Sequence, residues 1–167
     1  MAKWGKADFE QLKALQERLQ KLQDADLDKF CEQCSKELAA RLLALVIPRT
    51  PVGKYPKGMG KNGGTLRRGW TGGKRTGASA YAQSLPVTKV GHNYSIEVIN
   101  PVEYASYVEF GHRQTPGRFV PAIGKRLKAS WVDGQYFLTV SEEELQRMTP
   151  VIIQRKLDQL LREVFNG

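Results

Sequence analysis

Residues 104–111 read Tyr-Ala-Ser-Tyr-Val-Glu-Phe-Gly, and the interpretation of the chain starts from this stretch. Four large apolar side chains within seven residues predict a compact aromatic–aliphatic cluster on a short helix over residues 103–110. A glycine fits the position directly after such a helix, because it adopts a left-handed backbone without steric cost. We expect three of these side chains to pack in the core: Tyr104, Val108 and Phe110.

The charged residues around this stretch favour a structural role over a catalytic one. Glu109 and Arg113 are expected to form a structural or subunit-contact ion pair. Residues 58–64, Gly-Met-Gly-Lys-Asn-Gly-Gly, lack the spacing of a phosphate-binding loop and do not follow a predicted strand. No nucleophile–histidine–carboxylate set and no carboxylate pair stands out. We therefore expect neither an enzyme nor a bound cofactor.

Helical periodicity dominates both ends of the chain. Apolar residues spaced three and four apart predict helices over 8–23 and from residue 27 to about 47, where Pro48 should end the second helix. Ser141-Glu-Glu-Glu144 reads as a capping box that opens a C-terminal helix over 141–165. Pro150 is expected to kink or restart that helix, with Thr149 as the new cap.

The middle of the chain carries strand signals. Residues 87–90 and 94–98 alternate apolar and polar side chains around Gly91-His92-Asn93, which predicts a β-hairpin. A second hairpin is predicted over 130–140, because Asp133-Gly134 is a preferred type I′ turn. The expected fold is α+β in one domain, residues 1–167, with terminal helices packed on a small, mainly antiparallel sheet within 84–140.

The net charge of +9 is concentrated in the middle of the chain. Residues 38–96 contain no Asp or Glu, and residues 48–77 hold nine glycines, three prolines and eight cations. We predict that 48–77 is a mobile loop that orders only against packaged DNA or an acidic protein surface. The predicted contact residues are Arg49, Lys54, Lys57, Lys61, Arg67, Arg68, Lys74 and Arg75.

Two alternatives to this interpretation stay open. The loop could be no more than a solvated tether, since charge runs often are. The chain could instead be a small nucleic-acid-binding protein, because Tyr55 and Trp70 lie among the loop cations and could stack on bases. Assembly state and the salt dependence of DNA binding discriminate between the interpretations.

The cysteines and the hydropathy pattern carry less information. Cys31 and Cys34 form a lone CxxC on a predicted helix. Such a pair can be a redox pair or half of a metal site, but we favour two reduced cysteines that act as small apolar residues. His92 and His112 lack ligand spacing, so no metal site is predicted. No apolar run is long enough for a membrane span, and the N-terminus does not resemble a signal peptide. Folding in the cytosol is expected.

Three stretches together resemble a phage neck or tail-completion family named after the tenth gene product of a lambdoid coliphage. Residues 50–53, Thr-Pro-Val-Gly, followed by 64–70, Gly-Thr-Leu-Arg-Arg-Gly-Trp, resemble its first motif split by an insertion. Residues 104–111 match the second motif, and 117–122, Gly-Arg-Phe-Val-Pro-Ala, match the third. The order agrees over about residues 27–165. The chain departs from the pattern by lacking the aspartate of the first motif and by the predicted hairpin at 131–140.

The resemblance implies a structural protein of a phage or prophage virion, assembled in the bacterial cytoplasm. Such proteins close into a ring, six copies by analogy, that completes the tail and joins it to the head around the DNA channel. The implied partners are further copies of the chain, a head-completion or adaptor protein, and a tail terminator or tail tube protein. The motif residues carried over as a core are Tyr104, Tyr107, Val108, Glu109, Phe110, Gly111, Phe119 and Pro121.

Overall fold

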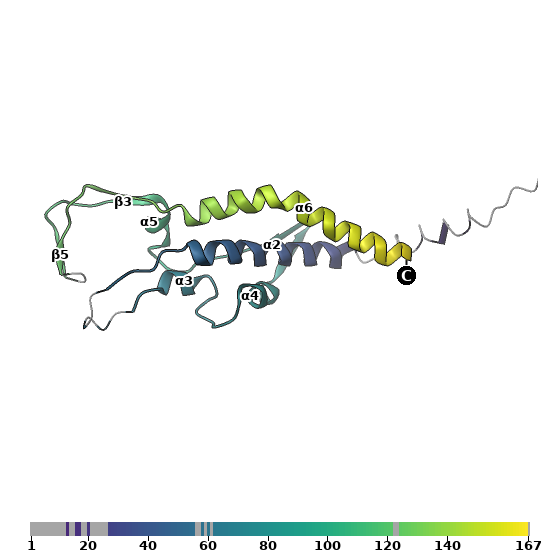
Figure 1. Ribbon diagram of the computed structural model, residues 1–167, viewed down its shortest axis with the longest axis horizontal. Helices are drawn as coiled ribbons and strands as arrows, with labels where there is room; N and C mark the ends of the chain where they lie inside the picture. Colours follow the sequence, from purple (N-terminus) through teal and green to yellow (C-terminus); the bar gives the residue numbers. More distant parts are fainter. Residues whose placement is uncertain are drawn as a thin grey trace, which may run out of the picture.

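Two long antiparallel helices form the body of the molecule in the computed structural model (Figure 1). The structure describes residues 13, 16, 17, 20, 27–55, 58, 60, 62–121 and 124–166. Helix α2 spans Leu27–Arg49 and helix α6 spans Phe137–Asn166. Leu43 and Val46 of α2 are fully buried, and they lie in one cluster with Phe137 of α6. The predicted α+β class is confirmed, since short antiparallel strands accompany these helices.

Helix α2 follows its predicted apolar periodicity but ends two residues later than expected. Pro48 lies inside the last turn, and Arg49 is the final residue. The backbone N–H and the hydroxyl of Thr50 both donate to the carbonyl of Val46, at 2.9 and 2.7 Å. A proline one residue from a helix end removes one hydrogen bond, and the Thr50 side chain closes the turn instead.

The prediction of one long loop over 48–77 is wrong for its second half. Helix α3 spans Thr65–Gly69 and helix α4, which the sequence analysis missed, spans Ala78–Ser84. Leu66 and Trp70, four residues apart, are buried against α2, and Trp70 is only 2% exposed. Glycines on both sides hid this short helical period. A base-stacking role for Trp70 is excluded by its burial.

The first predicted hairpin is confirmed. Strand β1 (Val87–Val90) pairs antiparallel with β2 (Asn93–Ile96), and Val87 faces Ile96 in the register. Gly91, with φ of 62°, sits in the two-residue turn. Ile96 and the following Val98 pack against the core cluster, so this hairpin lies against α2.

The second predicted hairpin is wrong, and so is the capping box. Strand β6 (Trp131–Asp133) pairs with β3 (Gly111–Arg113), which directly follows helix α5 (Ala105–Phe110). After Gly134 the chain enters α6 at Phe137, four residues before the predicted cap Ser141. The Ser141 hydroxyl is buried and donates to the carbonyl of Phe137, inside the helix.

Strands β3 and β6 begin an arm that leads away from the helical body (Figure 1). The arm ends in the pair β4 (Phe119–Val120) and β5 (Lys125–Arg126). The strands of the described residues therefore form three separate two-stranded ladders and not the single sheet that was expected. Below, "the arm" means residues 111–121 and 124–133.

Two remaining predictions concern helices. Most of the predicted first helix, 8–23, lies outside the described residues; Lys13, Gln16 and Gln20 within it are helical and exposed. Helix α6 continues through Pro150 and bends part-way along its length (Figure 1). Thr149 does not restart it, because its hydroxyl donates to the carbonyl of Leu145. In the described ranges, no helix combines the length and the apolar character needed to cross a membrane.

Candidate assembly interface

Glu109 is the buried centre of the 104–111 motif. Its carboxylate accepts hydrogen bonds from the N–H groups of Leu138 and Thr139, at 3.0 and 2.9 Å, and from the Thr139 hydroxyl at 2.7 Å. These N–H groups belong to the first turn of α6, where no intrahelical acceptor exists. Glu109 is therefore an N-terminal cap supplied from another helix. The expected ion pair with Arg113 is wrong.

The aromatic residues of the motif face the opposite way from the prediction. Tyr104, Tyr107 and Phe110 are exposed, Phe110 by 58%, and Val108 is half-buried beside the core. The prediction that Tyr104 and Phe110 pack in the core is wrong. Glu109, Val108 and Ala105 take the inner side of this six-residue helix, so its aromatic side chains lie outside.

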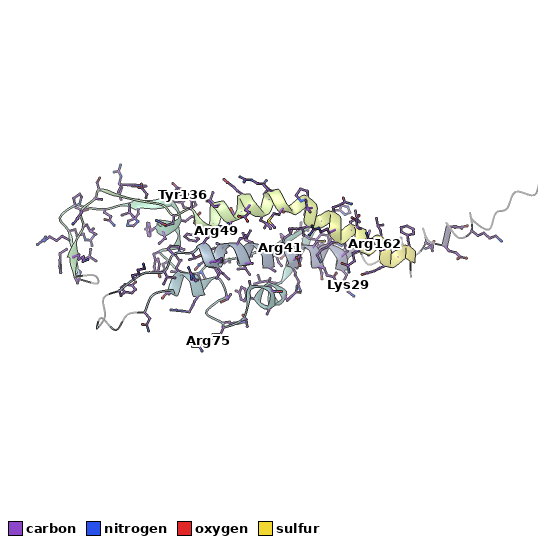
Figure 2. All side chains as sticks on the ribbon, viewed as in Figure 1. Lys29, Arg41, Arg49, Arg75, Tyr136 and Arg162 are labelled. Carbon is purple, nitrogen blue, oxygen red and sulfur yellow. The ribbon has the colours of Figure 1, made fainter. Side chains whose placement is uncertain are left out.

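The arm residues of the third motif are also exposed. Phe119 is 50% exposed and Pro121 is exposed, so neither belongs to the core of this chain. Trp131 on β6 and Tyr136 just before α6 add two more exposed rings, and Figure 2 labels Tyr136 near the start of α6. The Tyr107 ring contacts His112 edge-on, with centroids 5.7 Å apart. Exposed aromatic residues are enriched in protein–protein interfaces.

Gly111 explains how the arm can start directly after α5. Its φ is 83°, and a Cβ there would lie 2.4 Å from the carbonyl oxygen of Val132. Gly134 on the returning strand is just as confined, because a Cβ would lie 2.2 Å from the carbonyl oxygen of Glu109. Both positions need glycine for the close approach of the two chain segments.

The eight predicted basic contact residues do not form one free set. Arg49 pairs with Glu144 of α6, and it therefore joins α2 to α6. Arg67 donates from Nη2 to the carbonyls of Thr50 and Pro48, at 2.7 and 3.0 Å. These two arginines stabilise the fold. Lys57 and Lys61 lie outside the described residues.

The remaining predicted cations are exposed along the segment from the end of α2 to α4. Among the described residues, the Arg68 side chain donates to the carbonyl of Gly63, at 3.2 Å, and to the Thr65 hydroxyl, at 3.4 Å. Lys54, Lys74 and Arg75 are exposed, and Figure 2 shows Arg75 on the outer side of the segment between α3 and α4. These four exposed cations are the predicted contact residues that a partner can still reach.

An exposed polar cluster ties the β1–β2 hairpin to the start of α2. Lys89 and the Tyr94 hydroxyl both donate to the carboxylate of Asp28, and these two bonds lower the pKa of the Asp28 carboxyl. The same carboxylate raises the pKa of the Lys89 ammonium and of the Tyr94 hydroxyl. The Lys89 ammonium also lies 5.4 Å from the centre of the Tyr94 ring.

The two cysteines are reduced and lie on α2. Cys34 is buried, and burial raises the pKa of its thiol, which lowers the fraction of reactive thiolate. Within the described ranges, no three His, Cys, Asp or Glu residues come close enough together to hold a metal ion.

Sequence reasoning missed the charge of the arm. Residues 111–132 contain no Asp or Glu and five cations, all exposed: Arg113, Arg118, Lys125, Arg126 and Lys128. The signal was present in the sequence, because this is the second longest run without Asp or Glu, after residues 38–96.

A family model of phage proteins, described as a tail component of the kind of bacteriophage HK97 gp10, matches residues 13–111, more than half of the chain. The chain belongs to this HK97-gp10-like family. The expected resemblance is thereby confirmed, and the protein is a structural, tail-component-like phage protein. The match ends at Gly111, so it contains α2, α3, α4, the first hairpin and α5, but neither the rest of the arm nor α6. Searches of curated proteins and of solved structures find no match.

Proposed function

We propose that copies of this HK97-gp10-like protein close into a ring in the neck of the virion, where the ring completes the tail and joins it to the head around the DNA channel. Six copies are proposed by family analogy. The proposed neighbours are a head-completion or adaptor protein on one side and a tail terminator or tail tube protein on the other.

The observation that carries this proposal is a group of five exposed aromatic residues on and beside α5 and on the segment that returns to α6, which we call the aromatic surface. Each ring is 45–58% exposed in the single chain: Tyr104, Tyr107, Phe110, Trp131 and Tyr136. Aromatic residues are enriched in protein–protein interfaces and often supply most of the binding energy. A tail component needs such a surface, because it acts only by contacting other virion proteins.

Inactivation of the gene in its phage or prophage tests the proposed role. We expect DNA-filled heads and separate tails, which combine into infectious particles when the purified protein is added to the lysate. Electron microscopy of the isolated necks should show a closed ring containing this chain. Normally joined particles without the protein would overturn the proposal, and so would necks in which its copies do not touch.

A second variant set tests the aromatic surface itself. Tyr107→Ala with Phe110→Ala should leave the isolated chain folded, because both rings are exposed, but should abolish head–tail joining. The matched control is Val90→Ala with Val151→Ala, which removes two exposed apolar side chains elsewhere. If both variants join heads to tails equally well, the aromatic surface has no role in assembly.

Contact between the exposed cations and packaged DNA remains a proposal. Lys54, Arg68, Lys74 and Arg75 could bind phosphate without reading sequence, since no recognition helix is involved. Changing Lys74 and Arg75 to Gln should then reduce the salt dependence of DNA binding. DNA binding that is unchanged by this substitution would assign the cations to solvent or to a protein partner.

A further inference from the structure

We infer that the basic arm of one copy docks into an acid-edged apolar groove of the next copy, and that this contact is the interface repeated around the ring. The inference rests on the proposed ring and assigns the two surfaces that would build it. It concerns a protein–protein contact between identical chains.

The first surface is the tip of the arm. Phe119 is half exposed, and it faces Arg126 in the β4–β5 register, so a ring and a cation lie on the same side of the ladder. Arg118 precedes the ring, and Lys125 faces Val120. The Arg126 guanidinium also donates to the carbonyl of Gly117, at 2.7 Å. The tip therefore presents an exposed ring and a cation on one side of the ladder, with two more cations beside them in the sequence.

The arm also needs a partner for its own stability. A two-stranded hairpin alone in water is marginally stable at best. The β4–β5 ladder consists of two residue pairs and lies at the far end of the arm, away from α2 and α6 (Figure 1). Burying Phe119 and ordering the tip against another molecule would supply the missing stabilisation.

The second surface is a groove of about 400 Å³ between residues 97–106 and the start of α6. Its walls are apolar and include Val98, Ile99, Val102 and Leu138, and Ile99 is exposed. Two exposed carboxylates also line it, those of Glu97 and Glu103. Unlike Glu109, these two are free of any role in capping α6.

The two surfaces fit each other in chemistry. An aromatic side chain flanked by arginines matches an apolar groove that carries two carboxylates, and such complementarity selects partners and fixes the register of an interface. The arm and the groove are different patches on one chain. A contact between them is therefore heterologous, and repetition of a heterologous contact produces a closed ring when the rotation between copies allows it.

A second copy suits the arm better than duplex DNA does. Phosphate contacts need exposed cations alone, whereas the half-exposed Phe119 at the tip gains nothing from a DNA backbone. The groove supplies a complementary site on the same chain. DNA binding by the arm is nevertheless a distinct outcome in the experiment below.

Charge reversal in two places tests the inference with the full-length chain. The arm variant carries Arg118→Glu and Arg126→Glu, and the groove variant carries Glu97→Lys and Glu103→Lys. Each should weaken self-association at least about tenfold by sedimentation velocity, because like charges placed opposite each other cost several kcal/mol and 1.4 kcal/mol is tenfold. Mixing equal amounts of the two variants should restore rings, since every contact in an alternating ring is again complementary.

Two further measurements complete the experiment. A control variant, Arg155→Glu with Arg162→Glu, reverses two exposed cations on α6 and should assemble like the wild type. A photoreactive amino acid in place of Phe119 should cross-link to residues 97–103 of another copy, which mass spectrometry of isotopically mixed chains identifies.

The outcomes separate this inference from the proposed function. Rings that form normally from the arm and groove variants would overturn the arm–groove contact and leave the neck ring intact. Loss of DNA binding by the arm variant with unchanged assembly would assign the arm to phosphate. If residue 119 cross-links only to residues of its own chain, the arm–groove contact between copies is also overturned. Absence of this chain from purified necks would instead refute the proposed function.

Discussion

The carboxylate of Glu109 accepts hydrogen bonds from both the N–H and the hydroxyl of Thr139, at 2.9 and 2.7 Å, across thirty residues of sequence. The whole arm lies between these two residues. Its departure from α5 and its return into α6 are held together by this buried carboxylate and by the backbone N–H groups of Gln135 and Tyr136, which donate to the carbonyls of Val108 and Glu109 at 2.8 and 3.1 Å.

Glu109→Ala is expected to destabilise the protein by about 2–4 kcal/mol. It removes three hydrogen bonds to a buried charge, and bonds to charged groups contribute about 1.5–3 kcal/mol. A carboxylate near a helix N-terminus is also favoured by the helix dipole. Urea unfolding followed by circular dichroism measures the change. Glu103→Ala, which removes an exposed carboxylate from the same region, is the control and should cost less than about 0.5 kcal/mol. Equal midpoints for the two variants would contradict the capping role.

The role of Glu109 illustrates what the sequence could and could not predict. The helices α2 and α5 and the β1–β2 hairpin follow local periodicity and turn residues, so they were predicted close to their observed bounds. The start of α6 was misplaced because its cap comes from Glu109 and not from a neighbouring residue. The local sequence predicted a hairpin turn at Asp133-Gly134 and a helix cap at Ser141. The observed start of α6 is instead fixed by a contact between residues about thirty positions apart.

The orientation of the 104–111 motif was a second point beyond the sequence. Aromatic residues usually lie inside and glutamates outside, and this average preference predicted the reverse of what α5 does. The direction of a short helix depends on what it packs against.

Tyr104→Ala and Phe119→Ala should each cost the isolated chain less than about 1 kcal/mol, because both rings are about half exposed. Trp70→Ala should cost about 3–5 kcal/mol. The Trp70 ring is buried, and its N–H donates to the Thr50 hydroxyl at 2.8 Å. The ring also packs edge-on against Phe137, with ring centroids 6.2 Å apart. Thermal melts of the three variants rank their losses of stability. A melt of Phe119→Ala as low as that of Trp70→Ala would place the arm tip in the core.

Gly111→Ala should be strongly destabilising, by about 2–4 kcal/mol. The new Cβ would combine a positive φ, which costs about 1–3 kcal/mol in non-glycine residues, with a contact of 2.4 Å to a backbone oxygen. Gly91→Ala is the matched control. It has a similar positive φ of 62° but nothing within 4 Å, so it should show only the conformational cost, about 1 kcal/mol. Equal losses in chemical denaturation would mean that the segments around Gly111 can separate without cost.

Asp28→Asn should lower the melting temperature at neutral pH but not at pH 2. The pKa of the Asp28 carboxyl is lowered in the folded state, so its contribution is present above the unfolded pKa and is lost as pH falls through the folded pKa. The effect should be small, because the cluster with Lys89 is exposed. Glu32→Gln, which neutralises another exposed carboxylate of α2, is the control. A difference between Asp28→Asn and the wild type that persists unchanged at pH 2 would separate the effect from the ionisation of Asp28.

Arg67 and Arg68 are neighbours with opposite expected roles, and their separate substitution tests whether the basic segment has both. Arg67→Gln should destabilise the fold by about 1–3 kcal/mol, because its guanidinium donates to the carbonyls of Thr50 and Pro48 and so holds α3 to the end of α2. Arg68→Gln should change stability by less than about 0.5 kcal/mol, since its side chain is exposed and its bonds at 3.2 and 3.4 Å are long. Urea titration of both variants measures their stabilities, and head–tail joining assays measure their function.

If Arg68→Gln joins heads to tails as the wild type does, this exposed arginine is solvated and not a partner contact. If Arg67→Gln is as stable as the wild type, the second half of the basic segment is held by its buried apolar residues, Leu66 and Trp70, alone.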